Sequence, residues 1–326
     1  RRQRQMCIRD SRRTGLSNAC GHRSYACTLV NAGVQADMDW MVLGLLAGLV
    51  LGAYDFLTKL ALGEKSVLEV VFWCSALGAL LWLPFVAMGD SSSAALDLRQ
   101  QMLLLPKSLM MVATWVLSYY SVKALPLSIS AGVRASGPLW TALGAVFLLS
   151  EHLGWWQWLG LAVSMASYYL FSLVGQKEGI GFGRNLWVLC MLAATLLSSA
   201  NALYDKHILA TLRMDLVAVQ AWSALQRGAL ALLLLPWIWR GLELRSLLGR
   251  NWAVPAIALA YVLAESIYLA AVQMEGAQIA VISVLRRANL VMVFALSARF
   301  FAERHLRPKA AAMAGVLLGI ALTMAR

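Results

Sequence analysis

The chain consists of long apolar runs separated by short polar stretches. From Met38 onward, runs of about 20 mostly apolar residues recur, and this is the length that an α-helix needs to cross the hydrocarbon core of a bilayer. They lie at roughly 40–60, 66–88, 102–122, 126–149, 155–175, 185–210, 216–239, 252–272, 277–301 and 308–325. The pattern predicts an all-α polytopic membrane protein of about ten transmembrane helices, with no room for a separate soluble domain.

One run contains a break signal. Pro138 follows Gly137 inside the fourth run, whereas most other prolines fall near run ends. Proline weakens a helix locally, and irregular backbone at membrane depth must be covered by protein or line a cavity. We therefore expect a discontinuity near residue 138.

Composition supports lipid as the main solvent. The chain is 60% hydrophobic and 13% charged, whereas soluble domains are about 45–50% apolar and about 25% charged. A water-soluble fold would have too few polar residues to cover its surface.

The first 37 residues differ from the rest. They hold seven of the 28 Lys and Arg residues and show no helical periodicity. The run from Met6 to Ser11 resembles a translated sequencing adapter, so residues 1–37 are expected to be a non-native or disordered extension, with translation starting at Met38. The alternative is a basic arm for nucleic acid or anionic lipid.

The remainder reads as two related halves, 38–175 and 185–326, of five helices each. Three pairs of residues share an offset of 152: Pro84 with Pro236, Arg134 with Arg286, and Glu151 with Glu303. An odd number of helices per repeat places the two halves in opposite orientations. Inverted repeats are a recurring plan of secondary transporters, with the substrate site at the repeat interface.

Small residues recur at four-residue spacing in two of the runs. The sequence has Gly44, Gly48 and Gly52 in the first run, and Ala311, Gly315 and Gly319 in the last. Such spacing lets helix backbones approach closely in lipid, so we interpret both sets as packing surfaces.

These features resemble the EamA-like transporters of the drug/metabolite transporter superfamily. The resemblance rests on VRASGPLWTALGAVFLLSEHLGWWQWLGLAVS at 133–164, VLRRANLVMVFALSARFFAERHLRPKAAAMAGVLLGIAL at 284–322 and GAYDFLTK at 52–59. It implies ten helices in two inverted halves, a location in the cell (inner or plasma) membrane, and transport of metabolites such as amino acids, nucleosides or sugar derivatives. The Arg286-Arg287 pair departs from the family pattern and looks more like the paired cations of the related sugar-phosphate translocators.

Ionisable residues near the middle of apolar runs are the first candidates for a binding site. They are Arg134, Arg227, Arg286, Arg287 and Glu265. Each costs roughly 2.5–3.5 kcal/mol at bilayer depth unless it is paired or wetted. Their excess of positive charge favours an anionic or zwitterionic substrate, because Arg holds carboxylate or phosphate through two parallel hydrogen bonds. We expect one of Arg286 and Arg287 to face the cavity and the other to pair, with Glu265 as a candidate partner; the alternative is that all these charges only lock helices together.

A second group of candidates comprises aromatic and gating residues. Tyr119, Tyr120 and Trp222 are candidate cavity residues, with packing as the alternative. Asp55, Lys59, Asp205, Lys206 and His207 are candidates for coupling or gating. Asp55 and Lys59 are spaced for an intrahelical ion pair, and Lys59 and Lys206 would equally suit snorkelling to the interface.

The function expected from these features is secondary transport by alternating access, with a small-molecule substrate, a lipid environment, and a proton or counter-solute as coupling partner. No P-loop, HExxH or GxSxG motif is present, so we expect no cofactor, metal, nucleic-acid partner or enzymatic activity. The alternatives are a proton-coupled exporter of cationic amines or drugs that uses Glu265, and an intramembrane enzyme.

Loop charges give an expectation for orientation. Ten Lys and Arg residues fall in loops after odd-numbered helices, against Arg99, Lys107, Arg213 and Arg326 on the other side. The positive-inside rule then places both native termini outside the cytoplasm. The family resemblance implies the opposite orientation, and the two expectations remain in conflict.

Overall fold

The computed structural model describes residues 17–88, 96–125, 130, 133–134, 136–176, 185–238, 252–300 and 306–324. All regular secondary structure in these ranges is helical, which confirms the predicted class. The helices are α2 (Ser17–Glu64), α3 (Val67–Met88), α4 (Leu98–Ala124), α6 (Gly137–Leu149), α7 (Trp155–Gln176), α8 (Leu186–Lys206), η1 (His207–Thr211), α9 (Leu216–Leu232), α10 (Leu235–Ile238), α12 (Ala253–Gln273), α13 (Ile279–Leu285), η3 (Arg286–Ala288), α14 (Asn289–Phe300) and α15 (Leu306–Met324).

Five helical stretches are long and apolar enough to cross a membrane. Within the described ranges they are Asp39–Gly63, Val67–Ala87, Leu98–Ala124, Leu186–Thr211 and Ala253–Gln273. Each of the other predicted runs contains at least one described helix.

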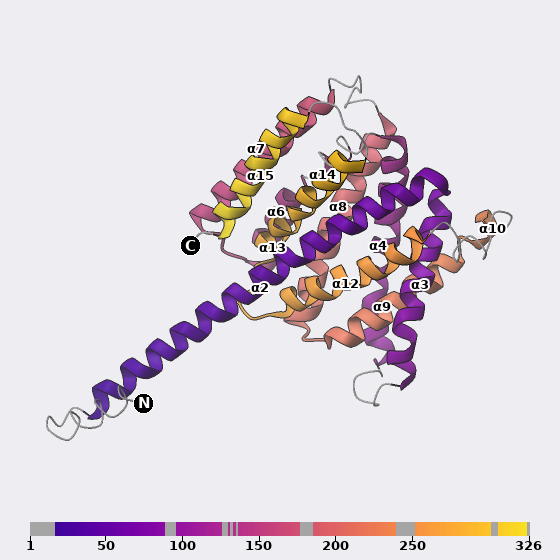
Figure 1. Cartoon of the computed structure of the whole chain (residues 1–326). Helices are drawn as coiled ribbons and strands as arrows, with labels where there is room; N and C mark the ends of the chain where they lie inside the picture. Colours follow the sequence, from indigo (N-terminus) through magenta and orange to yellow (C-terminus); the bar gives the residue numbers. More distant parts are fainter. Residues whose placement is uncertain are drawn as a thin grey trace.

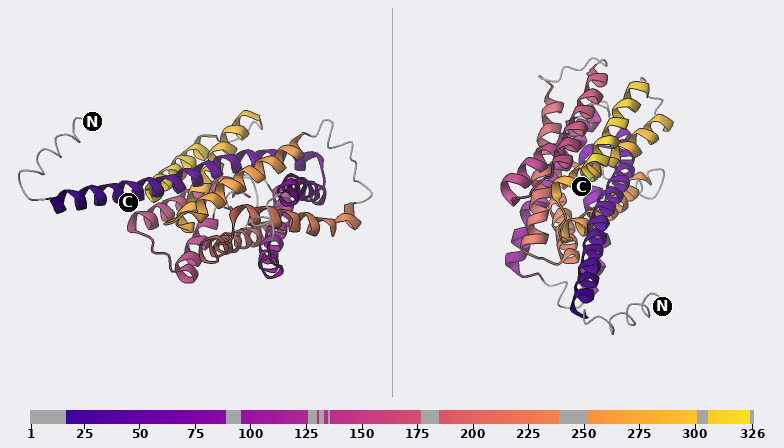
Figure 2. Two further views of the ribbon diagram at one scale, coloured as in Figure 1. Left: turned by 90° about the horizontal axis from the view of Figure 1, so that it is seen from below. Right: turned by 90° about the vertical axis from the view of Figure 1, so that its left-hand side faces the viewer.

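Helix α2 is longer than the sequence predicts. It begins at Ser17 and its first part projects away from the bundle (Figures 1 and 2). Residues 17–37 are helical in the structure, and no proline interrupts the chain between Ser17 and Met38. That residues 1–37 are a non-native or disordered extension stays a prediction. Residues 1–16 lie outside the described residues, and a translation start at Met38 stays a prediction.

The fourth helix of each half is interrupted near its arginine. Helix α6 begins at Gly137 with Pro138 in its first turn, so the expected discontinuity is present. In the second half, α13 ends at Leu285 and a 3₁₀ turn, η3, separates it from α14. The uninterrupted run expected at 277–301 was wrong in this respect.

Proline explains where the seventh run breaks. Helix α9 ends at Leu232, and the short α10 follows after a turn. Pro236 lies in α10, four residues after Leu232. In a continued helix its ring would clash with the carbonyl of Leu232, so the helix ends there.

The helices pack mainly in pairs drawn from different halves. Helix α2 lies against α12, α4 against α8, α3 against α9, α6 against α13, and α7 against α15. Figure 1 shows α7 and α15 side by side at one edge of the molecule. Neither half therefore has a core independent of the other.

Close helix contacts depend on glycine, as the four-residue spacing predicts. A Cβ added at Gly319 would lie 2.8 Å from the Gly160 carbonyl oxygen, and one at Gly48 would lie 2.9 Å from the Arg286 carbonyl oxygen. The packing interpretation of both small-residue sets is confirmed at these positions.

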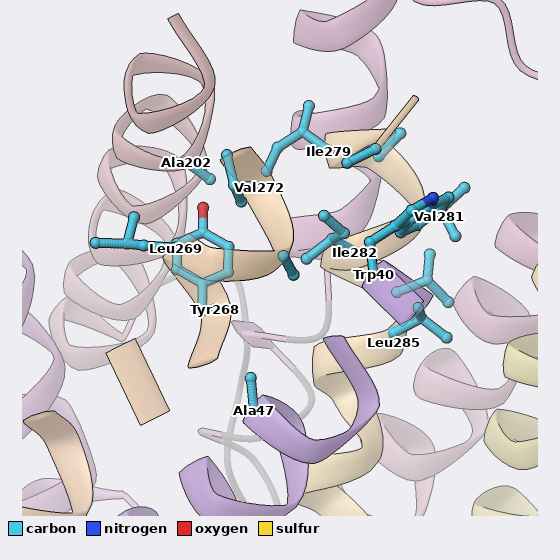
Figure 3. Packing of buried hydrophobic residues seen from close by; sticks show 14 of the residues in the cluster. Trp40, Ala47, Ala202, Tyr268, Leu269, Val272, Ile279, Val281, Ile282 and Leu285 are labelled. Atoms are coloured by element: carbon cyan, nitrogen blue, oxygen red, sulfur yellow. The ribbon is translucent and has the colours of Figure 1, made fainter. Parts of the chain in front are cut away.

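An apolar core joins α2, α12 and α13 beside the interruption. Tyr268 and Leu269 of α12 belong to one cluster of buried residues with Ile282 and Leu285 of α13 and Ala47 of α2 (Figure 3). Because these side chains are buried, the core holds the end of α13, and hence Arg286, in a fixed position.

Candidate binding site

A cavity of about 130 Å³ lies between α2, α4, α6, α8, α12 and the interrupted helix α13–η3–α14. Its wall combines arginine, hydroxyl and aromatic side chains. The residues predicted from sequence that line it are Asp55, Tyr119, Arg134, Arg286 and Arg287. Those that do not line it are Lys59, Tyr120, Asp205, Lys206, His207, Trp222, Arg227 and Glu265.

Arg134 is neutralised inside the cavity wall. Its Nη2 donates a hydrogen bond to Asp55 Oδ1 at 2.9 Å, and Asn289 Nδ2 donates to Asp55 Oδ2 at 2.7 Å. Three elements thus meet at one buried carboxylate. The expected pair between Asp55 and Lys59 was wrong, because Asp55 turns toward Arg134 instead.

Arg286 is the cation with the fewest protein partners in the wall. Its guanidinium carbon lies 4.0 Å from the centre of the Tyr268 ring, a distance typical of a cation–π contact. Its Nε is buried without a hydrogen bond, and no carboxylate of the described residues lies within ion-pair distance. A guanidinium in this state can bind an anion through two parallel N–H donors.

Arg287 also lines the cavity but is held by backbone. Its Nη1 donates to the Arg134 carbonyl at 3.3 Å and its Nε to the Ser283 carbonyl at 3.5 Å. The expectation that one arginine of the pair faces the cavity while the other pairs is therefore met only in part, since both face it. Glu265, the candidate partner, forms an ion pair with Lys107.

Aromatic residues form another part of the wall. The Tyr54 and Tyr119 hydroxyls share a hydrogen bond of 2.5 Å, and Tyr261 packs edge-on against Trp115 with ring centres 4.8 Å apart. Arg227 lies behind this cluster, with its guanidinium carbon 5.5 Å from the Tyr261 ring centre. Tyr119 lines the cavity, and its role in binding stays a prediction.

Two other aromatic candidates lie elsewhere. Tyr120 is exposed and stacks on Trp187 with ring centres 6.2 Å apart. Trp222 is half-buried against the apolar core. Their positions favour packing, which was the alternative interpretation for both.

A buried ion triad lies beside the cavity. Lys107 Nζ of α4 donates to Asp205 Oδ1 of α8 at 2.5 Å and to Glu265 Oε1 of α12 at 3.2 Å. The Lys107 and Asp205 side chains are fully buried and that of Glu265 is 7% exposed. Glu265 therefore pairs with Lys107 and not with an arginine of the ninth run.

Sequence reasoning missed Lys107 because it was assigned to a loop. Helix α4 begins at Leu98, where Asp97 and Gln100 form a capping box, so Lys107 lies more than two turns inside the helix. The Asp-x-x-Gln pattern could have placed this start correctly. Its burial also removes one of the four charges counted on that side for orientation.

Lys59 and Lys206 fasten helix ends. Lys59 Nζ donates to the Val122 carbonyl near the end of α4 at 2.9 Å, and Lys206 Nζ donates to the Ala277 carbonyl just after α12 at 2.5 Å. Cations are favourable beside the unpaired carbonyls of a helix C-terminus. His207 starts the π-helical turn η1, with its ring 6.4 Å from that of Tyr204.

The turn after α6 is hydrogen-bonded to the start of α13 in the second half, through Glu151, His152 and Gln278, and we call this contact the clasp. The Glu151 carboxylate accepts hydrogen bonds from the amides of Ile279 at 3.0 Å and Ala280 at 3.4 Å, which begin α13. Gln278 Nε2 donates to the His152 carbonyl at 2.9 Å. Burial raises the pKa of Glu151, although the two amides partly offset this effect. Its repeat partner, Glu303, lies outside the described residues.

Comparisons with known proteins agree with this architecture. Residues 38–173 match the EamA-like transporter family, which is part of the drug/metabolite transporter superfamily. A solved structure described only as "Crystal structure of protein" is similar with a TM-score of 0.67 and 18% sequence identity, over 87% of this chain and 95% of the other. No curated protein sequence matches the chain.

Proposed function

Because residues 38–173 match the EamA-like transporter family, we propose that the chain is a secondary transporter of a small anionic or zwitterionic metabolite, whose acidic group binds Arg286. Membrane transport is the family's activity, which favours a transporter over the alternative of an intramembrane enzyme. The finer points, namely the cargo, the site and the mechanism, rest on the cavity.

The observation that carries the proposal is the state of Arg286. Arg134 is paired with Asp55, and Lys107 with Asp205 and Glu265. Arg286 has the Tyr268 ring as its neighbour and a buried Nε without a hydrogen bond. A carboxylate, phosphate or sulfonate would satisfy it, because burying a charged donor without an acceptor is costly.

Alternating access between two inverted halves fits the packing pattern. If α2, α3, α4, α6 and α7 correspond in order to α8, α9, α12, α13–α14 and α15, the contact of α2 with α12 becomes that of α8 with α4. The contacts of α3 with α9, α6 with α13 and α7 with α15 map onto themselves. A two-fold relation between halves would produce this exchange, and it supports the ten-helix inverted plan.

The lysine contacts follow the same relation. Lys59 bonds the end of α4, and Lys206 bonds the segment after α12, which is the corresponding helix under that scheme. These contacts support a structural role for both lysines, and the coupling or gating role expected for them stays a prediction.

Export of cationic amines is the weaker candidate. It requires a carboxylate that a cationic drug can reach, and Glu265 is paired with Lys107 outside the cavity wall. Asp55 lines the cavity, but Arg134 and Asn289 occupy both of its oxygens.

A thermal-shift screen with purified full-length protein tests the proposal. Amino acids, organic acids, nucleosides, sugar phosphates and cationic dyes are compared on the wild type, on Arg286→Ala, and on Arg99→Ala, which removes an exposed arginine of α4. We expect an anionic or zwitterionic compound to stabilise the wild type and Arg99→Ala but not Arg286→Ala. Stabilisation by cationic dyes alone, unchanged in Arg286→Ala, would refute the arginine site.

Liposome uptake then separates transport from binding. The compound that stabilises the protein should accumulate in proteoliposomes containing the wild type, and uptake should fall by at least tenfold in Arg286→Ala. Binding without uptake would leave a membrane receptor rather than a transporter.

A further inference from the structure

The Lys107–Asp205–Glu265 triad has no role in anchoring the proposed substrate, yet it is the most deeply buried group of charges among the described residues. Lys107 is 0%, Asp205 1% and Glu265 6% exposed. One ammonium faces two carboxylates across α4, α8 and α12. Burying a second carboxylate beside one cation is expensive unless other charges or a proton compensate.

The two carboxylates, Asp205 and Glu265, have different charged neighbours. Glu265 faces Lys107, and the nearby guanidiniums of Arg227 on α9 and Arg286 on η3 also attract it. Lys107 and Arg286 attract the Asp205 carboxylate, whereas Glu265 repels it. The Asn201 amide donates a hydrogen bond to Asp205 Oδ2 at 3.1 Å. With Arg227 close to Glu265 and behind the aromatic cluster, Glu265 is the better stabilised anion of the two.

Polar atoms surround Asp205. The Asn201 Oδ1 is buried without a hydrogen-bond partner among the described residues. The Tyr268 hydroxyl and, on the same helix, the Tyr261 hydroxyl interact electrostatically with Asp205. A protonated Asp205 would gain an O–H donor, and these oxygens are acceptors that could receive it.

Asp205 is also linked to the proposed substrate site. Tyr268 lines the cavity and its ring carries the Arg286 guanidinium. Ala202, three residues before Asp205 on α8, lines the cavity as well. The carboxylate therefore lies directly behind a wall shared with Arg286, within electrostatic reach of an anion bound there.

We infer that Asp205 is a proton-binding site whose protonation is coupled to anion binding at Arg286. In this step the Asp205 carboxylate accepts a proton from hydronium in the cavity, forming a neutral carboxylic acid and water. Loss of its negative charge favours an anion at Arg286, and by reciprocity the anion favours the proton. Proton and anion would then bind together, as symport requires; this coupling rests on the function proposed above.

Infrared difference spectroscopy of the full-length protein in lipid tests the proton site without any substrate. We expect a protonated-carboxyl C=O band that appears as pH falls and shifts when aspartate, but not glutamate, is labelled with ¹³C. Asp205→Asn should remove the band, and Glu275→Gln, an exposed carboxyl near the end of α12, should leave it. A band that ignores the aspartate label, or that disappears in Glu265→Gln but persists in Asp205→Asn, would overturn the assignment. The labelling result stands even if a variant fails to fold.

Methanesulfonate serves as the probe for coupling, because its sulfonate does not titrate in this pH range, with uncharged dimethyl sulfone as the size-matched control. Its affinity for the wild type should rise at least about fivefold as the band appears. Asp205→Asn should bind it with the low-pH affinity at every pH, and Arg286→Ala should not bind it. A pH-independent wild-type affinity would refute the coupling.

The two proposals fail in different ways. If methanesulfonate does not bind while the Asp205 band persists, the anion site at Arg286 is wrong and the proton site survives. If methanesulfonate binds through Arg286 and the band is absent, the anion site survives and the proton site is wrong.

Discussion

Arg134 lies just before α6, and Arg286 lies in the turn η3 between α13 and α14. The two positions correspond in the proposed repeat, but different groups surround them. Asp55 neutralises Arg134, whereas an aromatic ring covers one face of Arg286. A charge with a fixed partner contributes to structure, while a guanidinium without an acceptor is available to a ligand. The offset of 152 residues therefore relates the two positions in sequence without giving them the same role.

Removing Arg134 should destabilise the protein through Asp55. In Arg134→Ala the buried Asp55 carboxylate keeps only Asn289 as a donor, and we expect a loss of about 1–3 kcal/mol of folding free energy. The double variant Arg134→Ala with Asp55→Asn should recover part of that loss, because no unpaired charge remains. Thermal unfolding in detergent measures both; equal stability of the single and double variants would contradict the pairing.

Replacing Lys107 should have a larger effect. Lys107→Met leaves two buried carboxylates facing each other, and removing one partner of a buried ion pair costs about 3–5 kcal/mol. Adding Asp205→Asn should restore a measurable part of the stability. Arg99→Met on the exposed face of α4 is the matched control and should change little. A Lys107→Met variant as stable as this control would show that the triad is not a structural unit.

For individual residues, the sequence indicated which charged side chains are buried, but not which groups they pair with. Their positions in the middle of apolar runs identified Arg134, Arg286 and Glu265 as charges that require a partner or a polar cavity. Which groups pair depends on contacts between helices far apart in the chain, such as the one joining Lys107 to Glu265. No local pattern contains that information.

At the scale of the helices, glycine residues determine where two helices can pack closely. Helices α7 and α15 touch at Gly160 and Gly319, with backbone atoms in contact. Helix α2 likewise passes η3 at Gly48. Sequence spacing predicted these close approaches, but it did not predict the 3₁₀ turn of η3, because that interruption arises where α2, α12 and the broken helix pack together.

Gly319→Ala tests the contact between α7 and α15. The new methyl group would lie 2.8 Å from the Gly160 carbonyl oxygen, and overpacking of this kind typically costs about 1–3 kcal/mol. Gly78→Ala in α3 meets no atom within 4 Å and should be neutral or stabilising by about 0.5–1 kcal/mol. Thermal unfolding of the two variants should differ in sign or size; identical effects would rule out the close contact.

At the scale of the whole molecule, the clasp at Glu151 joins the two halves. Burial raises its pKa above the ordinary value of 4.5. The folded state then binds this proton more tightly than the unfolded state, so its contribution to stability is present below about pH 4.5 and is lost as pH rises through the folded pKa. We expect the unfolding temperature to fall less over that window in Glu151→Gln than in the wild type. Glu275→Gln, which removes an exposed carboxyl, is the comparison variant. A Glu151→Gln variant with the same pH dependence as the wild type would contradict the burial of this carboxyl in the folded state.

The all-helical class could be predicted from the sequence, because hydropathy and length constrain each helix separately. The segments 52–59 and 133–164 also indicated the family that residues 38–173 match. The arrangement of those helices was predictable only as a resemblance. The apolar runs indicate that α4 and α8 lie away from water. That these two helices pack against each other depends on the shapes of both surfaces.

The separation of Lys107 from its partners has a consequence for synthesis. Asp205 and Glu265 lie 98 and 158 residues later in the chain. At roughly 5–20 residues per second, the ribosome makes them on the order of 5 to 30 s after Lys107. During that interval Lys107 has no carboxylate partner, and an unpaired lysine at bilayer depth costs roughly 2.5–3.5 kcal/mol, so we expect α4 to insert less readily before α8 is made. The rate of translation between these helices thus bears on how much of the nascent chain is correctly inserted.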